Sequence, residues 1–298
     1  MLGAHVSIAG GIHNAPHNGK KATCEVVQIF TRSRNQWREK KLVAREVEKF
    51  REAQEETGVK VVCAHDNYLI NLASPDRVLF RKSLNAFIEE MKRCDLLGIP
   101  TLVAHPGAHV DSGEKKGLKR ITEAFNRIFD RTPDGRVTIC LETTAGQGTS
   151  LGYRFEHLAE ILDKVENADR LAVCLDTCHV FVAGYPIGTK SGYRTTMKAF
   201  DDLLGLERLL VIHMNDAKRE LGSRIDRHER IGKGCIGTEP FGYILNDRRL
   251  AKVPKILETP KKSPRDDRMN LRILRSLVKD GKHKGRKPSS SPYRIPHG

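Results

Sequence analysis

The sequence predicts an α/β fold, a single (β/α)8 TIM barrel. Eight short apolar runs alternate with amphipathic helical patterns along the chain, which is typical of a parallel barrel. No linker interrupts residues 1–280, and a length of 298 residues suits one barrel of this kind. We therefore expect one domain over residues 1–280, followed by a tail at 281–298.

The eight apolar runs are expected to form buried strands because they are short and mostly β-branched. They cover 2–6, 25–30, 59–65, 101–105, 137–142, 171–176, 209–215 and 253–258. Helical patterns lie between most of them, with apolar residues recurring three and four positions apart. The clearest patterns cover 42–58, 76–98, 117–129 and 154–165. The first ends at a glycine, which is a helix stop signal.

The charge predicts a polyanionic partner. The net charge is +15 with a pI near 9.6, which favours nucleic acid first and an anionic membrane surface second. The tail at 281–298 holds five Lys or Arg residues and no acidic residue, so its removal leaves a net charge of +10. Its Pro, Ser and basic composition predicts disorder.

The chain has the composition of an intracellular protein. No apolar run approaches the ~20 residues needed to span a bilayer, and the N-terminus lacks a secretory pattern. The seven cysteines are odd in number and form no C-x-x-C pair, which favours free thiols in a reducing compartment. We expect a monomer without a membrane partner, cytoplasmic and nucleoid-associated if the chain is prokaryotic.

The carboxyl ends of the predicted strands carry the clearest functional signal. Six consecutive strands end in a residue able to bind metal, and a barrel brings all these ends to one face. A single histidine at a strand end is more often structural, but six ionisable ends in succession would be costly to bury without a bound cation. These residues are His65, His105, Glu142, Asp176, His213 and Glu258.

Three further candidates follow strands six and seven. His179 lies three residues after Asp176 in "LDTCH". Asp226 and His228 lie two apart in "SRIDRHERIGKGCIG", so in an extended segment both side chains point the same way. The candidate ligands are then five histidines and four carboxylates, which is more donors than one ion needs.

This set of donors limits the chemistry. Mixed imidazole and carboxylate ligation suits zinc or manganese, and the absence of cysteine ligands argues against an iron–sulfur cluster. Two or three ions fit the number of donors. Three divalent ions carry a charge of +6, and the four carboxylates contribute −4. The remaining charge of +2 is balanced by one hydroxide and one phosphodiester. The cluster therefore favours water activation and phosphoryl transfer.

Together with the surrounding motifs, these residues resemble the endonuclease IV family of zinc-dependent apurinic/apyrimidinic endonucleases, which act in base excision repair. The matching segments occur in family order and span residues 3–259, nearly the whole predicted barrel. They are "GAHVSIAGG", "HDNYLINLAS", "AHPGAH", "LETTAGQG", "CLDTCH", "HMNDAK", "GSRIDRHERIGKGCIG" and "ILET".

The resemblance implies a three-zinc mechanism of phosphodiester hydrolysis, with manganese as an alternative at one or more sites. A metal-bound hydroxide, with Glu142 and Glu258 as the catalytic carboxylates, would attack the phosphorus 5′ to an abasic nucleotide in duplex DNA. The products would carry a 3′-hydroxyl and a 5′-deoxyribose phosphate. The implied ligand sets are His65, His105 and Glu142; Glu142, Asp176, His213 and Glu258; and His179, Asp226 and His228.

Two loops at the strand ends are candidates for DNA contact. One follows the second predicted strand, and the other follows the third, where Tyr68 and Leu69 come after His65. In "TRSRNQWRE" three arginines, Arg32, Arg34 and Arg38, flank Trp37, and arginine can neutralise phosphates while an aromatic side chain can wedge into a base stack. The alternative is that Trp37 packs on the barrel rim while the arginines are solvated.

In the family these two loops enter the minor groove and help to expose the flipped-out abasic sugar. The implied DNA-binding residues are Arg34, Asn35, Gln36, Tyr68 and Leu69. The sequence departs from the family at Asn35, which occupies the position where an arginine is often inserted.

Two other functions compete with this interpretation. A divalent-metal sugar isomerase also places His, Glu and Asp around a barrel mouth, but it needs two ions and no positive charge. A nucleic-acid-binding protein with structural metals, or none, is the second alternative. Structural zinc sites are normally closed and often rich in cysteine, unlike this set of donors.

Overall fold

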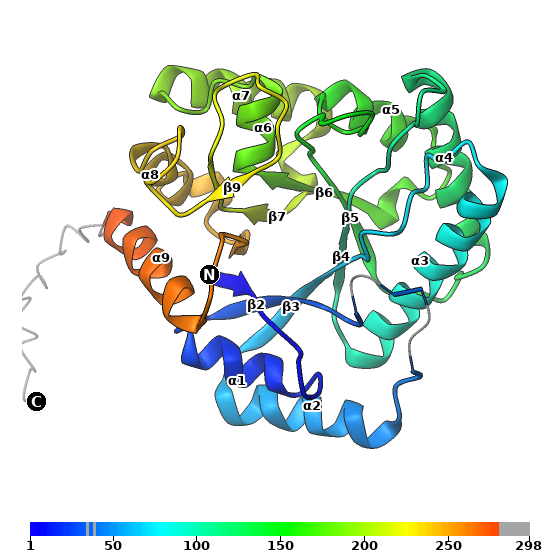
Figure 1. Cartoon of the computed structure of the whole chain (residues 1–298), viewed down its shortest axis with the longest axis horizontal. Helices are drawn as coiled ribbons and strands as arrows, with labels where there is room; N and C mark the ends of the chain where they lie inside the picture. Colours follow the sequence, from blue (N-terminus) through cyan, green and yellow to red (C-terminus); the bar gives the residue numbers. More distant parts are fainter. Residues whose placement is uncertain (34–35, 38–39, 280–298) are drawn as a thin grey trace, which may run out of the picture.

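The computed structural model describes residues 1–33, 36–37 and 40–279, and these form a closed barrel of eight parallel strands (Figure 1). Around the barrel the strands follow the order β1-β10-β7-β6-β5-β4-β3-β2. The predicted fold class is confirmed, and each of the eight predicted runs contains one barrel strand. The strands are β1 (Leu2–His5), β2 (Val26–Phe30), β3 (Lys60–His65), β4 (Thr101–Ala104), β5 (Thr138–Glu142), β6 (Leu171–Asp176), β7 (Leu209–His213) and β10 (Lys255–Leu257).

The helices lie outside the barrel and cover its wall (Figure 1). Four of them confirm the helical patterns predicted from apolar spacing: α2 (Ala44–Thr57), α3 (Arg77–Leu97), α4 (Glu114–Asp130) and α5 (Phe155–Lys164). The other α-helices in the described part of the chain are α1 (Asn14–Lys21), α6 (Thr177–Ala183), α7 (Lys190–Leu204), α8 (Glu239–Leu245) and α9 (Pro264–Leu277). The helix α1 is hard to predict because its sequence, "NAPHNGKK", contains both proline and glycine.

A layer of small apolar side chains fills the barrel interior. Its buried members are Val26, Cys63, Val103, Cys140, Ala172, Cys174, Val211 and Ile256. The pairing of β2 with β3 shifts by one residue within this layer, because Val27 pairs with Val61 whereas Gln28 pairs with Cys63. The extra residue of this shift is Val62 on β3, whereas β2 alternates regularly. Gln28 therefore lies on the same face of β2 as Val26, and its polar side chain points into the barrel.

A two-stranded antiparallel sheet holds the loop that follows β7. Its strands are β8 (Asp216–Ala217) and β9 (His228–Glu229). The carboxylate of Asp216 accepts hydrogen bonds from the backbone of Gly234 and Ile236, both at 3.0 Å. Gly234 has no room for a side chain, since a Cβ there would lie 2.3 Å from the carbonyl oxygen of Ala217. These contacts fold the loop back over the face where the strands end.

The basic tail at 281–298 lies outside the described residues, so its predicted disorder remains a prediction. Among the helices of the described residues, none combines the length and the apolar character that a membrane crossing requires. Six of the seven cysteines are buried and Cys235 is exposed, and all seven are free thiols, as expected.

Candidate metal centre

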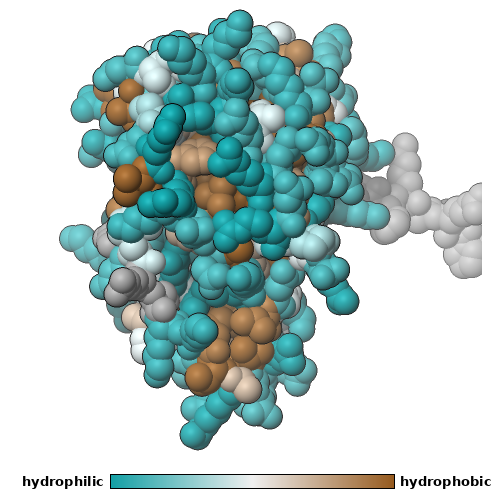
Figure 2. All heavy atoms as spheres, turned by 90° about the vertical axis from the view of Figure 1, so that its right-hand side faces the viewer, coloured by the Kyte–Doolittle hydropathy of each residue, from teal (hydrophilic) through white to brown (hydrophobic). Residues whose placement is uncertain are grey.

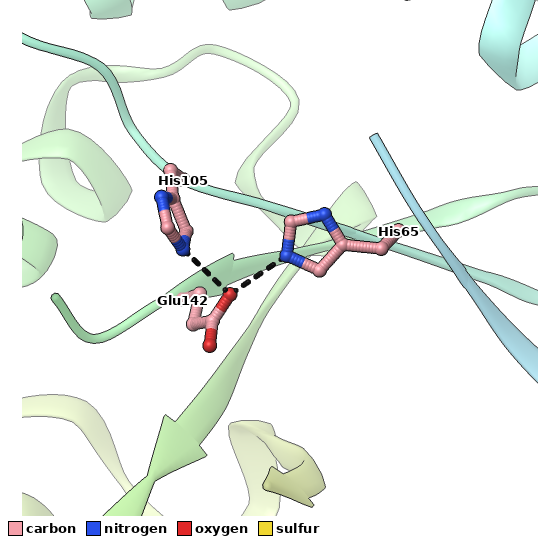
Figure 3. A group of neighbouring side chains, drawn as sticks. All are labelled: His65, His105 and Glu142. Carbon is pink, nitrogen blue, oxygen red and sulfur yellow. Dashed lines mark hydrogen bonds and ion pairs between the residues drawn. The ribbon is translucent and has the colours of Figure 1, made fainter. Parts of the chain in front are cut away.

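The first group of candidate ligands gathers at the ends of β3, β4 and β5. The Nε2 atoms of His65 and His105 lie 2.9 and 3.1 Å from the same carboxylate oxygen, Oε2 of Glu142 (Figure 3). His65 and Glu142 are buried, whereas the His105 side chain is 37% exposed. Two imidazoles and one carboxylate oxygen therefore converge on a point that is open to solvent on one side.

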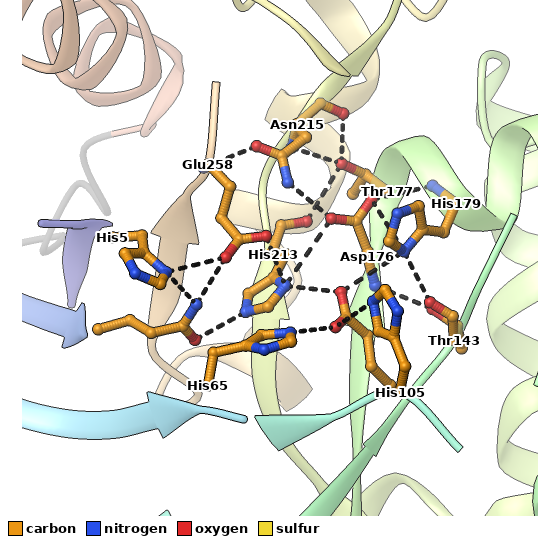
Figure 4. Close-up of polar contacts among 12 residues, drawn as sticks. His5, His65, His105, Thr143, Asp176, Thr177, His179, His213, Asn215 and Glu258 are labelled. Carbon is orange, nitrogen blue, oxygen red and sulfur yellow. Dashed lines mark hydrogen bonds and ion pairs between the residues drawn. The ribbon is translucent and has the colours of Figure 1, made fainter. Parts of the chain in front are cut away.

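The second group shares Glu142 with the first. Its other oxygen, Oε1, lies 2.8 Å from Nδ1 of His213. The same nitrogen lies 3.3 Å from Oε2 of Glu258 and 3.8 Å from Oδ2 of Asp176 (Figure 4). The two oxygens of Glu142 thus face different groups, which is the arrangement of a bridging carboxylate.

The third group lies where α6 begins and the loop after β7 folds back. Nε2 of His179 lies 3.2 Å from Oδ2 of Asp226, and Nε2 of His228 lies 3.6 Å from Oδ1 of the same residue. The backbone nitrogen of Asp226 donates to Gln147 at 2.8 Å, which connects this loop to the segment after β5. All nine predicted ligands are therefore brought together in the three predicted groups, and within each group the ligand atoms lie within 4.8 Å of one another.

Hydrogen bonds at the opposite ring nitrogens orient several imidazoles. Nδ1 of His65 lies 3.0 Å from the carbonyl oxygen of Asp66, and Nδ1 of His179 lies 2.8 Å from that of Thr143. Nδ1 of His228 lies 3.3 Å from the carbonyl oxygen of Glu258. Because a carbonyl can only accept, each Nδ1 carries a proton, and each Nε2 is the nitrogen that remains to bind an ion in the cluster. Imidazoles held in this way by an outer contact are typical of metal ligands.

Comparisons with known proteins agree with this geometry. The family described as "Xylose isomerase-like TIM barrel" matches residues 17–277. The "Probable endonuclease 4" of Geobacter sulfurreducens is 54% identical over 279 residues, which are 93% of this chain and 94% of that protein. The crystal structure of endonuclease IV from Thermus thermophilus matches with a TM-score of 0.81 at 34% identity, covering 93% of this chain and 98% of that one. The chain belongs to the endonuclease IV family.

This membership confirms the predicted enzyme class, a metal-dependent DNA endonuclease and therefore a hydrolase. The barrel is also shared with sugar-converting enzymes, which bears on the isomerase alternative. A D-tagatose 3-epimerase-like protein matches with a TM-score of 0.70 over 93% of this chain and 96% of its own, but at 17% identity. A likeness at that level shows the fold alone.

The donors of the endonuclease IV centre strongly influence each other's protonation. Burial alone would raise the pKa of Glu142, but the imidazoles of His213 and His105 hold it well below its ordinary value. Burial would likewise raise the pKa of Asp226, yet His179 and His228 lower it to about 2. For His65 the directions are opposite. Burial lowers its pKa, while Asp66 and Glu142 raise it well above the ordinary value. Glu142 and Asp226 are therefore charged at neutral pH and can compensate cations.

The two loops expected to contact DNA lie next to each other at this face. Arg34, Asn35 and Arg38 lie outside the described residues, so the departure at position 35 remains a prediction. Gln36 is exposed, and Tyr68 is 56% exposed with its ring 5.3 Å from that of Phe30.

Asn67 connects the two loops. Its side-chain amide donates to the backbone oxygens of Ser33 and Gln36 at 2.7 and 3.1 Å, and its side-chain oxygen accepts from the backbone of Leu69 at 2.8 Å. Gln36, Tyr68 and Leu69 are therefore held as one surface beside the first ligand group.

Two residues of the loop after β2 differ from the expectation. Arg32, grouped with the phosphate-binding arginines, is only 5% exposed and its Nε lies 2.5 Å from Oε1 of the buried Glu90. It therefore holds the loop from inside. Trp37 is partly buried against the core, with the Lys82 ammonium 4.4 Å from its ring centre. Trp37 thus packs on the barrel as the alternative expected, but the solvated arginines of that alternative are not found at Arg32.

Three polar residues around the centre escaped the sequence analysis. Asn215 donates to Oδ2 of Asp176 at 2.6 Å and accepts from the backbone nitrogen of Glu258 at 2.7 Å. Gln28 and His5 contact Glu258 from the other side. The available signals were a polar residue inside the apolar run "VVQIF" and a histidine at the end of the first strand.

A hollow on the outside of the barrel is separate from the centre. It has a volume of about 850 Å³ and lies between α3 and α4, lined by residues such as Phe80, Arg81 and Arg127. This wall is mainly hydrophilic, with hydrophobic areas between the charged side chains (Figure 2). None of the nine candidate ligands contributes to its lining, so among the described residues the chemistry is concentrated at the strand ends.

Proposed function

We propose that this chain is a DNA repair endonuclease of base excision repair that hydrolyses the phosphodiester bond 5′ to abasic sites in duplex DNA. The products would carry a 3′-hydroxyl and a 5′-deoxyribose phosphate. The observation that carries the proposal is the position of Glu142, whose two oxygens face two different ligand groups. The nearby third group of His179, Asp226 and His228 distinguishes this centre from one built for two ions.

The donors fit three divalent ions, which we propose to be zinc, with manganese as an alternative at one or more sites. Each group supplies imidazole nitrogen and carboxylate oxygen, the donors that zinc and manganese accept, and cysteine is not needed. Bound ions of this kind lower the pKa of water and neutralise charge that develops on a phosphoryl group. The proposed ligands are the nine residues of the three groups, with Glu142 common to two of them.

The residues of the chain hold and align the reacting groups. Glu142 and Glu258 are the proposed catalytic carboxylates, because both lie within 3.3 Å of Nδ1 of His213 at the centre of the cluster. The carbonyl contacts of His65, His179 and His228 keep three Nε2 atoms directed inward. A centre organised before the substrate arrives avoids reorganisation during the reaction.

The proposed partner is duplex DNA that contains an abasic site. The net charge of +15 favours a polyanion, and the surface of Gln36, Tyr68 and Leu69 lies beside the first ligand group. Arg34 and Asn35 complete the proposed DNA-binding set. We propose that the enzyme acts as a monomer in the cytoplasm, on the DNA of the nucleoid.

The test is a nicking assay with zinc-loaded protein. A labelled duplex with one abasic-site analogue is compared with an intact duplex of the same sequence. The expected result is a single cut immediately 5′ to the analogue, with the intact duplex spared.

No cleavage by protein with three zinc ions demonstrably bound would contradict the proposal. Turnover of an open-chain sugar by the same preparation would then support the isomerase. Cleavage of both duplexes at similar rates would contradict the assignment of abasic sites as the substrate.

A further inference from the structure

Gln28 is a fully buried amide directly beneath the second ligand group. Its exposure is 0%, and it lies on the inward face of β2, two residues after Val26 and paired with Cys63. Its Nε2 lies 2.6 Å from Oε1 of Glu258 and 2.9 Å from Nδ1 of His5. Its Oε1 lies 2.9 Å from Nε2 of His213 and 3.2 Å from the sulfur of Cys63. The carboxylate of Glu258 lies between His5 and His213 (Figure 4).

These four contacts match the full hydrogen-bonding capacity of a side-chain amide, which has two N–H donors and two acceptor lone pairs. Glu258 is a carboxylate when it serves as a ligand and can only accept. The reversed amide would therefore place two acceptor oxygens 2.6 Å apart at Glu258. Only one orientation of Gln28 is compatible with its surroundings, with Nε2 donating to Glu258 and Oε1 accepting from His213.

This orientation determines the protonation of His213. Because Oε1 of Gln28 can only accept, Nε2 of His213 must carry a proton, and Nδ1 is the nitrogen that remains to bind an ion. The histidines His65, His179 and His228 show the opposite arrangement, since a backbone carbonyl holds Nδ1 in each. Among these four imidazoles, His213 is the one whose outer nitrogen contacts a side-chain amide and not a backbone carbonyl.

We propose that Gln28 is a positioning residue of the metal centre: it selects Nδ1 of His213 as the ligand atom and directs the carboxylate of Glu258 toward the same ion. This inference rests on the metal centre of the proposed function. Backbone carbonyls cannot be removed by substitution, but the partner of His213 can. Outer contacts of this type contribute to metal affinity by fixing the orientation and tautomer of the ligand.

The first experiment measures zinc affinity in the full chain with the substitution Gln28→Met. Methionine has a similar size and is apolar, so it removes the four contacts with little loss of packing. Competition with a chromophoric chelator should show one of three zinc ions held about 10 to 100 times more weakly, the usual effect of losing such a contact. Gln54→Met is the matched control, because Gln54 accepts a hydrogen bond from the backbone of Val61 at 2.9 Å, away from the ligands.

The second experiment identifies the ligating nitrogens by long-range ¹⁵N NMR of the imidazoles in zinc-loaded protein. The unmodified chain should show one histidine bound through Nδ1 and the other ligating histidines bound through Nε2. Gln28→Met should lose that single Nδ1 pattern, which a purely structural role would leave unchanged. This measurement on the unmodified chain remains decisive if the variant does not fold.

Two results would overturn the proposal. The first is the absence of an Nδ1-bound histidine in the unmodified chain, and the second is zinc affinity of Gln28→Met within about twofold of the parent. Neither measurement uses DNA. A failure here is therefore distinguishable from a failure of the endonuclease proposal, which the nicking assay with unmodified protein decides separately.

Discussion

At the scale of single residues, Glu142 connects the two buried ligand groups. It is fully buried, and its oxygens lie 2.9 and 2.8 Å from imidazole nitrogens of His65 and His213. Glu142→Gln keeps the shape but removes the negative charge that both groups share. We expect the rate of cleavage at an abasic site to fall by about 10³-fold or more, because a metal centre supplies several kcal/mol of transition-state stabilisation. Steady-state nicking together with zinc content measures this loss.

The control for this substitution is Glu156→Gln. Glu156 lies on α5 with its side chain 53% exposed and paired only loosely with Arg154, at 3.5 Å. Its cleavage rate should match that of the parent. A near-normal rate for Glu142→Gln would refute the bridging role.

Tyr68 represents the second kind of proposed functional residue, one expected to contact the substrate but not the metal. Its ring is 56% exposed and packs edge-on against Phe30 beside the ligand His65. Tyr68→Ala should weaken binding of an abasic duplex by about tenfold, since an aromatic contact to nucleic acid contributes ~1–3 kcal/mol. Fluorescence anisotropy measures the affinity, and chelator competition checks that zinc binding is unchanged.

Tyr68→Phe separates the contribution of the aromatic ring to DNA affinity from that of the hydroxyl. It keeps the aromatic surface and should retain most of the affinity. If Tyr68→Ala bound the abasic duplex as tightly as the parent, the proposed DNA surface would be wrong at this residue.

At the scale of elements, the helix α3 holds the loop that follows β2. Glu90 on α3 is 1% exposed and accepts hydrogen bonds from Arg32 and Thr31 at the start of that loop. Arg93, one turn further along α3, donates to the backbone oxygens of Thr31 and Lys40. A helix on the barrel wall therefore determines the position of a loop that carries Gln36 on the catalytic face.

Glu90→Gln tests this anchor. The substitution leaves the Arg32 guanidinium buried without a counter-charge, and removal of one partner of a buried pair costs about 3–5 kcal/mol. Urea unfolding should show a loss of about 3 kcal/mol, accompanied by weaker binding of the abasic duplex. Glu89→Gln is the matched control, because the adjacent Glu89 is 58% exposed in a pair with Lys92 and should change stability by under ~0.5 kcal/mol. Equal effects of the two substitutions would contradict the anchoring role.

The same elements show which features of the fold and the site can be predicted from the sequence alone. Strand runs are recognisable because buried parallel strands are continuously apolar, and their ends are informative because a barrel gathers them on one face. This was enough to find six candidate ligands at strand ends, while the candidates His179, Asp226 and His228 also required motif spacing. Alternation along β2 turns Gln28 inward, but no role could be assigned to it, because its partners His213 and Glu258 lie 185 and 230 residues away in the sequence. Arg32 was assigned to DNA because sequence shows a charge but not the buried Glu90 that pairs with it.

At the scale of the whole molecule, the barrel concentrates ionisable groups from distant parts of the chain. His65 and Glu258, at opposite ends of the set, contribute to one cluster in which His213, Glu142 and Asp176 are fully buried. Such a concentration of charge is tolerated only when it is compensated. In this cluster imidazolium can compensate carboxylate, or bound cations can do so. The two modes of compensation respond to pH in opposite directions.

That opposition gives a prediction for stability against pH. Burial lowers the pKa of His65, His179 and His213, but the neighbouring carboxylates more than offset it, so all three pKa values are raised above the ordinary 6.5. A histidine with a raised folded-state pKa stabilises the fold below its unfolded pKa, and this stability is lost as pH rises through the folded value. EDTA-treated protein should therefore melt at a lower temperature at pH 9 than at pH 6.5, by about 3 °C or more.

The stabilisation that the protein gains from bound zinc should instead increase with pH. Zinc must displace the protons that these imidazoles hold, so its affinity and its effect on the melting temperature increase with pH. The measurement is a melting curve at each pH with zinc or with EDTA, and the gap between the two should widen from pH 6.5 to pH 9. Glu142→Gln should flatten both trends, because this carboxylate raises the pKa of all three histidines. A zinc-dependent gap that is constant over this range would show that the nine residues do not exchange protons for metal as one centre.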